Sequence, residues 1–299
     1  MAVKMMSEEV NVQKAGVSII IPVYNEEQAI GNVLEQLNQV MVKSNLQYEI
    51  LVVNDGSKDS TEKVAKSIEG VNVLNHKTNR GYGAAIKTGA RHAHYNLICI
   101  IDADGTYPND RIPELVKILE NDFDMVVAAR IGDNVEIPLL RKPAKWFINK
   151  LANYLAKTKI PDVNSGLRVM RKQIVEKFER ILPDGFSFTT TITLAMLTNG
   201  YSVKYVPINY FKREGKSKIK PIRDTFNFIQ LIIRTVLYFN PLSIFIPLSL
   251  FLVMLAFTVL FGSWFFLGRF MDVSFGVILM SAVIVIAIGM LADLIDKRL

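Results

Sequence analysis

Two aspartates separated by one residue, Asp102 and Asp104, directly follow an apolar run at 97–101 and are the strongest candidates for chemistry in this chain. An uninterrupted apolar run bounded by polar residues is typical of a strand buried on both faces of a parallel sheet. Ligands of open α/β sheets bind at the carboxyl ends of such strands. Neighbouring carboxylates repel each other, but a divalent cation on a diphosphate makes the arrangement favourable. Taken alone, the pattern also fits an ordinary turn at Asp104-Gly105 with Asp102 as a cap.

Two further strand ends carry polar groups, in the segments 22–26 (Pro-Val-Tyr-Asn-Glu) and 54–57 (Asn-Asp-Gly-Ser). In a parallel sheet, these loops and the aspartate loop emerge at the same edge and line one pocket. Asp55 can accept a hydrogen bond from a base N–H or a ribose hydroxyl, whereas Asp102 and Asp104 suit a metal ion on a diphosphate. Together, the three loops predict a nucleotide-diphosphate site.

The elements that must position these residues alternate along the first part of the chain. The expected strands are 17–23, 48–53, 71–74, 97–101 and 125–128, and the expected helices are 26–42, 61–68, 83–94 and 113–120. Helices at 142–156 and 172–181 and an edge strand at 203–208 follow less regularly. This alternation predicts an α/β domain with a mostly parallel sheet and helices on both faces.

The C-terminal part is strongly apolar, and the residues at 241–267 and 273–292 include none with a charge. Each run is long enough to cross a hydrocarbon core of ~30 Å as a helix, and the short turn between them predicts a transmembrane hairpin. A pair of buried core helices is the alternative. The chain is therefore divided into a polar start (1–16), an α/β domain (17–221), a candidate interfacial amphipathic helix (222–240), which could instead pack on that domain, and a membrane anchor (241–299).

Charge indicates the orientation of this anchor. The net charge is +7, and basic residues flank the outer ends of the hairpin, whereas its turn carries only Arg269. Positive charge accumulates on the cytoplasmic side, so the N-terminal domain and the C-terminus are both expected in the cytoplasm. The segment 1–16 has no apolar signal-peptide core, which agrees with this orientation.

The same basic residues limit the choice of partner. They suit anionic lipid head groups or a phosphorylated lipid. Nucleic acid is not expected as a partner, because no recognised nucleic-acid motif accompanies the charge. The single cysteine, Cys99, excludes a disulfide within the chain and a thiolate zinc site.

Nine short motifs in this order resemble the family-2 glycosyltransferases, specifically the dolichol-phosphate mannose synthase-like group of polyprenyl-phosphate sugar transferases. They are 22–26, 54–57, 79–83 (Asn-Arg-Gly-Tyr-Gly), 102–104, 129–130, Asp162, 165–168 (Ser-Gly-Leu-Arg), Arg213 and 215–218. The resemblance implies a GT-A type, Rossmann-like fold. It also implies inverting transfer of one sugar from a nucleotide-diphospho-sugar to a dolichyl or undecaprenyl phosphate, with magnesium or manganese as cofactor.

The resemblance also assigns roles. On the donor side, it implies that Pro22, Tyr24, Glu26 and Asp55 hold the nucleoside and that Asp102 and Asp104 bind the metal and the donor diphosphate. It implies that Asp162 lies near the reacting centre and that Arg130 and Arg141 meet the acceptor phosphate. Arg213, Ser217 and Lys218 would belong to a basic loop over the phosphates. Asp104, Asp162 and Arg130 are the expected catalytic residues.

Charge neutralisation explains these residue types better than base catalysis does. An acceptor phosphate is already anionic near neutral pH, so it needs a metal for the leaving diphosphate and arginines that bring a second anion close. The planar guanidinium suits bidentate phosphate contact. Asp162 could act as a base, or it could orient the acceptor or a sugar hydroxyl.

Two positions depart from the pattern of the relatives. Many have glutamine where this chain has Thr106, which leaves the third protein ligand of the metal unassigned, and Asn54 replaces a more usual aspartate.

Several alternatives stay open. One is a family-2 glycosyltransferase that acts on another acceptor, although the Gln-x-x-Arg-Trp signature of processive synthases is missing from the matching region. Another is a catalytically silent membrane scaffold. The sequence does not separate GDP- from UDP-linked donors, and an oligomer is compatible with the short anchor.

Overall fold

The computed structural model describes residues 16–130, 158–185, 187–211 and 240–296, together with Asn153, Ile233, Leu237 and Tyr238. The chain divides into two compact units. The first contains the sheet, the second contains the two long C-terminal helices, and each is described by itself.

Within the described residues, seven strands form one sheet in the order β3-β2-β1-β4-β6-β5-β7. Their bounds are β1 Val17–Val23, β2 Tyr48–Asn54, β3 Val71–Asn75, β4 Leu97–Ile100, β5 Met125–Arg130, β6 Arg168–Arg171 and β7 Val203–Ile208. Only β6 runs against its neighbours β4 and β5, and the other pairs are parallel. The predicted mostly parallel sheet is confirmed, including the edge position of β7. The sequence did not predict β6, because its four residues begin and end with arginine and give no strand-like apolar run.

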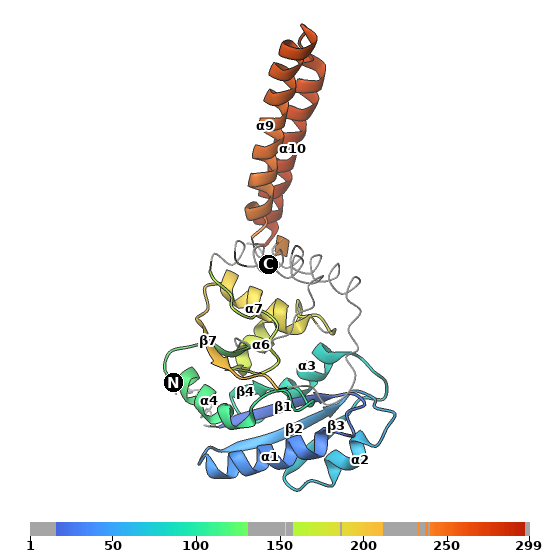
Figure 1. The fold of residues 1–299 in the computed structure, drawn as a ribbon, viewed down its shortest axis with the longest axis vertical. Coiled ribbons are helices and arrows are strands. Elements are labelled where there is room, and N and C mark those ends of the chain that lie inside the picture. Colours follow the sequence, from blue (N-terminus) through green and yellow to red (C-terminus); the bar gives the residue numbers. More distant parts are fainter. Residues whose placement is uncertain are drawn as a thin grey trace, which may run out of the picture. The chain divides into compact units, whose positions relative to one another are not determined.

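Helices cover both faces of this sheet, as predicted. The helices of this unit are α1 Ile30–Lys43, α2 Thr61–Lys66, α3 Tyr82–His92, the 3-10 turn η1 Asn109–Arg111, α4 Ile112–Glu120 and α6 Lys172–Phe178, and α7 Phe188–Thr198 has residues in both units. Ile19 and Ile21 of β1 share a buried cluster with Leu34 of α1 and Leu115 of α4. Ile20 points to the opposite face, because successive side chains of a strand alternate between the two faces of the sheet. Helices α1 and α3 lie on opposite sides of the strands (Figure 1).

Helix α3 approaches β1 closely at Gly89. A Cβ at Gly89 would lie 2.5 Å from Ile20 Cγ2, so the helix can rest on the strand only because this residue has no side chain. The close approach brings the first residue of α3, Tyr82, toward the strand ends.

Some predicted boundaries differ from the observed ones. Helix α1 begins at Ile30 rather than at residue 26, because the preceding loop is held against the 57–61 loop. Asn25 has a φ of +53°, and its N–H donates to Ser57 Oγ, while the N–H of Glu26 donates to Thr61 Oγ1. Helix α7 was not predicted, since its apolar and threonine residues show no helical periodicity.

The second unit contains an antiparallel pair of long helices, α9 Leu242–Leu267 and α10 Asp272–Asp296. Both are long and apolar enough to cross a membrane by length and composition. Small residues lie between them: the Ser249 hydroxyl donates to the carbonyl of Ala282 (2.9 Å), and Gly289 lies against the Phe245 ring. Large apolar side chains such as Phe266 and Val277 face outward. Small residues inside and large apolar residues outside are typical of helices packed in lipid.

The predicted hairpin is therefore confirmed, and α10 extends a few residues past its predicted end at 292. The helices predicted at 142–156 and 222–240 lie outside the described residues, apart from a few isolated positions.

Candidate active site

Three loops with polar residues lie at one edge of the sheet, where β1, β2 and β4 end. These strands are adjacent and parallel, with Val23 of β1 opposite Asn54 of β2 and Ile20 opposite Ile100 of β4. The N–H of Asp55 donates to the carbonyl of Val23, which joins the first two loops. Pro22 is buried within β1, and Tyr24 and Glu26 follow as half-buried residues. The sheet therefore brings the residues expected to bind the nucleoside to the edge that carries Asp102 and Asp104.

Asp55 is buried and accepts hydrogen bonds from the chain around it. Its Oδ1 accepts from the Arg80 N–H and lies 2.7 Å from His76 Nδ1, and its Oδ2 accepts from the Gly81 N–H. The other ring nitrogen of His76 is 2.9 Å from Thr88 Oγ1 in α3. Asp55 therefore positions the start of α3, a contribution that the sequence did not indicate.

The glycines of the motif at 79–83 allow two backbones to meet. A Cβ at Gly81, where φ is +105°, would lie 2.4 Å from the Asp184 carbonyl oxygen, and one at Gly83 would lie 2.1 Å from that of Pro183. The N–H groups of Gly83 and Ala84 donate to the carbonyls of Gly185 and Asp184. The sequence predicted a helix from residue 83, but the segment that docks on the start of this helix comes from a distant part of the chain.

Replacing Gly83 with alanine is expected to destabilise the sheet unit by about 1–3 kcal/mol, because an added methyl group in a packed site forces a backbone shift. The melting temperature of the purified protein measures this effect. Gly185→Ala is the matched control, since a Cβ there meets nothing within 4 Å. Equal melting temperatures for the two variants would contradict the role given to Gly83.

Asp102 lies between α3 and the loop that precedes β6. The Tyr82 hydroxyl donates to Asp102 Oδ1 (2.8 Å), and a Cβ at Gly166 would lie 2.1 Å from Asp102 Oδ2. Burial, and then the neighbouring charge of Asp104, raise the pKa of Asp102 to about 6. The site thus holds a carboxylate whose ionised form is costly without a cation.

Asp104 is buried and oriented by Thr106. Its Oδ1 accepts hydrogen bonds from the Thr106 N–H (3.2 Å) and hydroxyl (2.6 Å). Thr106 is fully buried, so the residue found in place of the expected glutamine supports one of the two aspartates. Among the described residues, no group of three or more His, Cys, Asp or Glu side chains is placed to hold a metal ion. Two adjacent carboxylates still fit Mg²⁺ or Mn²⁺, which take oxygen ligands and complete their shells with phosphate oxygens and water.

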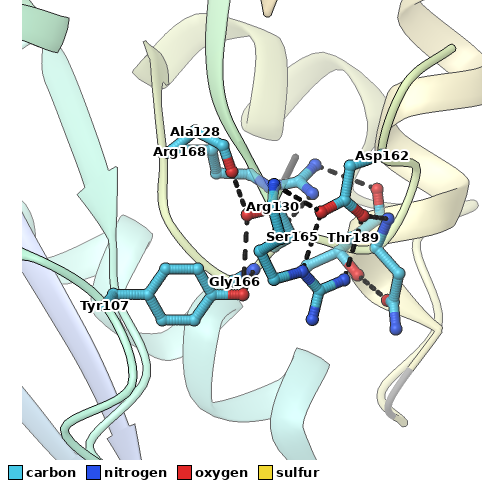
Figure 2. A network of polar contacts seen from close by, with 9 residues as sticks. Tyr107, Ala128, Arg130, Asp162, Ser165, Gly166, Arg168 and Thr189 are labelled. Carbon is cyan, nitrogen blue, oxygen red and sulfur yellow. Dashed lines mark hydrogen bonds and ion pairs between the residues drawn. The ribbon is translucent and has the colours of Figure 1, made fainter. Parts of the chain in front are cut away.

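Arg130 and Asp162, which the sequence predicted separately, form a bidentate ion pair (Figure 2). Arg130 Nε and Nη2 donate to the two carboxylate oxygens at 2.7 and 2.9 Å, and the Arg130 N–H adds a third bond of 3.1 Å. The N–H of Asn164 also donates to Asp162. Burial raises the pKa of Asp162, but the hydrogen bonds and charge of Arg130 outweigh it and hold that pKa below its usual range. Asp162 is therefore ionised at neutral pH and is a weak base.

Two tyrosines that the sequence did not single out connect the aspartate loop to Arg130. The Arg130 guanidinium lies 5.3 Å from the Tyr210 ring centroid, and Tyr210 packs edge-on against Tyr107 with centroids 5.4 Å apart. The Tyr107 hydroxyl accepts from the Gly166 N–H (2.6 Å). No signal in the sequence would have paired them, because the contact depends on β7 lying beside β5.

The motif at 165–168 has a structural function. Arg168 is fully buried, and its guanidinium donates to the carbonyls of Ser165 and Thr189, while the Ser165 hydroxyl donates to the carbonyl of Ala128 (Figure 2). Burial lowers the pKa of Arg168. These bonds hold the loop that carries Asp162 and Gly166 against the end of β5.

Four predicted site residues, Arg141, Arg213, Ser217 and Lys218, lie outside the described residues.

Several relatives of this chain are named as sugar transferases. It is 29% identical over 205 residues to a dolichyl-phosphate hexose transferase of Haloferax volcanii, covering 68% of this chain and 86% of the relative. It is 30% identical over 213 residues to an undecaprenyl-phosphate 4-deoxy-4-formamido-L-arabinose transferase of Klebsiella pneumoniae, covering 69% of this chain and 63% of the relative.

Solved structures share the fold at low sequence identity. Glucosyl-3-phosphoglycerate synthase of Mycobacterium tuberculosis in complex with UDP superposes with a TM-score of 0.59 at 16% identity, over 74% of this chain and 80% of that chain. The same enzyme is also solved with Mn²⁺ and UDP-glucose. Mannosyl-3-phosphoglycerate synthase of Rubrobacter xylanophilus has a TM-score of 0.56 at 20% identity, over 74% and 73% of the two chains. These likenesses agree with the predicted GT-A type fold.

The profile of the family described as "Glycosyl transferase family 2" matches residues 18–178, a range that contains the aspartate loop, Arg130, Asp162 and the motif at 165–168. This chain therefore belongs to glycosyl transferase family 2 and is a glycosyltransferase.

Proposed function

We propose that this glycosyltransferase moves one sugar from a nucleotide-diphospho-sugar to a polyprenyl phosphate, with inversion at the anomeric carbon, at the cytoplasmic face of a membrane. The observation that carries the proposal is the combination, in one chain, of the Asp102/Asp104 pair at the end of β4 with two helices long and apolar enough to cross a membrane. The names of the Haloferax and Klebsiella relatives, which specify dolichyl and undecaprenyl phosphates, support this acceptor class.

The donor would bind where β1, β2 and β4 end. Asp102 and Asp104 would hold Mg²⁺ or Mn²⁺ together with the donor diphosphate, and Pro22, Tyr24, Glu26 and Asp55 would hold the nucleoside. When bound, the cation supplies Lewis-acid neutralisation of the leaving diphosphate. Because the Thr106 hydroxyl is already bonded to Asp104, we assign the remaining ligand positions to donor oxygens and water.

Arg130, together with Arg141, would bring the acceptor phosphate to the anomeric carbon. A phosphate oxygen attacks that carbon opposite the leaving diphosphate, the bond from the anomeric carbon to the diphosphate oxygen breaks, and the configuration inverts. An acceptor that is already anionic needs no strong base, which agrees with the lowered pKa of Asp162. We therefore assign Asp162 the role of holding the Arg130 guanidinium in position.

The basic loop that contains Arg213, Ser217 and Lys218 would close over the phosphates. The last described residue before them, Phe211, donates its N–H to the carbonyl of Thr106 (3.0 Å). The chain therefore enters this segment beside the aspartate loop, which supports a contact with the diphosphate.

The catalytic domain and the C-terminus would both face the cytoplasm. This orientation rests on the basic residues outside the hairpin and the single Arg269 in its turn. Labelling of single cysteines, introduced at Arg269 and near the C-terminus in a Cys99→Ser background, would test it in intact cells. A membrane-impermeant reagent should label only the cysteine in the turn. Labelling of the cysteine near the C-terminus would show the opposite orientation and contradict the proposal.

Transfer of labelled sugar into an organic-extractable lipid tests the reaction itself. The full-length protein in detergent would receive polyprenyl phosphate, Mg²⁺ or Mn²⁺, and each of a panel of GDP- and UDP-sugars. We expect label in the lipid phase with one donor, lost on chelation of the metal. A parallel reaction with 3-phosphoglycerate tests a water-soluble phosphate acceptor. Transfer to that acceptor alone, or no transfer by folded protein with any donor, would contradict the proposal.

A further inference from the structure

We propose that Tyr82 is a positioning residue that fixes the Asp102 carboxylate for the divalent cation of sugar transfer. This inference rests on the metal site of the proposed function. Its basis is the 2.8 Å hydrogen bond from the Tyr82 hydroxyl to Asp102 Oδ1, which connects the first residue of α3 to the end of β4.

Tyr82 comes from a well-anchored part of the fold. The glycines on either side of it, Gly81 and Gly83, lie against the backbone of Pro183 and Asp184. Asp55 accepts the N–H groups of the two residues before Tyr82. The segment 80–82 therefore connects the carboxylate expected at the nucleoside to the one expected at the metal, and the backbone that carries the phenol is held at both ends.

Asp102 is confined on its other side by Gly166. The position of a Cβ on Gly166 would overlap the carboxylate, at 2.1 Å from Oδ2 and 2.5 Å from Cγ. Gly166 is itself held by the bond from its N–H to the Tyr107 hydroxyl. The phenol on one side and the Gly166 backbone on the other therefore confine the Asp102 carboxylate.

The chemistry of a phenol suits this position. A tyrosine hydroxyl ordinarily titrates at about pH 10, so it is a neutral donor throughout the physiological range. A donor on one carboxylate oxygen favours the ionised form and directs the second oxygen. Hydrogen-bond partners that orient a metal ligand typically contribute 10–100-fold to metal affinity. Phenylalanine at residue 82 would keep the ring without supplying the donor.

Manganese binding to the full-length protein in detergent tests the inference without relying on turnover. Free Mn²⁺ would be measured by electron paramagnetic resonance in the presence of UDP and, separately, GDP. We expect Tyr82→Phe to weaken Mn²⁺ binding about 10-fold, the lower end of the range for residues that orient metal ligands. Tyr205→Phe is the matched control, because the Tyr205 hydroxyl is buried and has no hydrogen-bond partner among the described residues. Its Mn²⁺ affinity should equal that of the unaltered protein.

The outcomes separate this inference from the proposed function. Unaltered protein that binds Mn²⁺, with Tyr82→Phe binding equally well, overturns the role of Tyr82 and leaves the metal site in place. Failure of the unaltered protein to bind Mn²⁺ with either nucleotide overturns the metal site and this inference together.

Gly166→Ala provides a second variant that disturbs the same carboxylate from the opposite side. We expect weaker Mn²⁺ binding by this variant as well, while the far-ultraviolet circular dichroism spectrum stays that of the unaltered protein. If both Gly166→Ala and Tyr82→Phe kept the Mn²⁺ affinity of the unaltered protein, binding of the cation would not depend on the position of Asp102.

Discussion

Replacing Asp104 with asparagine is expected to lower the rate of sugar transfer about a thousand-fold, the upper range for loss of a preorganised electrostatic contact. The side chain keeps its size, and an asparagine Oδ1 can still accept the two bonds from Thr106. The negative charge is lost, and the Oδ2 acceptor becomes an amide donor. Because Asp102 alone would then face the cation, both metal binding and neutralisation of the leaving diphosphate should weaken.

Initial rates of transfer into the lipid phase, measured over a range of Mn²⁺ concentrations, would check this expectation. Asp110→Asn is the matched control, since Asp110 lies a short distance further along the chain and is exposed. The control should keep the unaltered rate and melting temperature. Full activity of Asp104→Asn would show that Asp104 is not needed for transfer.

Replacing Arg130 with glutamine is expected to lower both stability and activity. Removing one partner of a buried ion pair leaves the other charge uncompensated and typically costs about 3–5 kcal/mol of the free energy of unfolding. The Arg130 and Asp162 side chains are only 26% and 11% exposed, so solvent would screen the remaining carboxylate poorly. We expect a loss of about 3 kcal/mol, and a fall in transfer rate of about a hundred-fold from the missing guanidinium.

The double variant Arg130→Gln/Asp162→Asn distinguishes the two effects. It removes both charges, so we expect most of the lost stability to return while transfer remains slow. Denaturant unfolding and lipid-phase transfer would be measured on the same preparations. Recovery of transfer in the double variant would mean that Arg130 acts only by compensating Asp162, and that it does not meet the acceptor phosphate.

The ion pair also predicts a pH dependence of stability. The folded-state pKa of Asp162 is lower than its unfolded value, so the ion pair stabilises the protein above the ordinary aspartate pKa. This stabilisation is lost as the pH falls through the lowered value. The melting temperature of the unaltered protein should therefore fall in acid more steeply than that of Arg130→Gln/Asp162→Asn, and parallel curves would contradict this prediction.

Much of the fold and part of the site follow from local patterns in the sequence. The buried run at 97–101 predicted β4, and therefore placed Asp102 and Asp104 at the end of a buried strand. The uncharged runs at 241–267 and 273–292 predicted α9 and α10, because hydropathy and helix length depend on neighbouring residues alone. The short strand β6 escaped prediction, since its antiparallel place between β4 and β5 is set by pairing with residues far away in the chain.

The sequence by itself determined which residues of this protein carry charge and at which strand ends they occur. Only the tertiary structure decided how those charges are paired. Arg130 and Asp162 are 32 residues apart and meet because the loop before β6 folds back to the end of β5. Tyr82 reaches Asp102 because Gly81 and Gly83 let a distant backbone dock on the start of α3. Such contacts depend on distances across the sheet, and no periodicity along the chain records them.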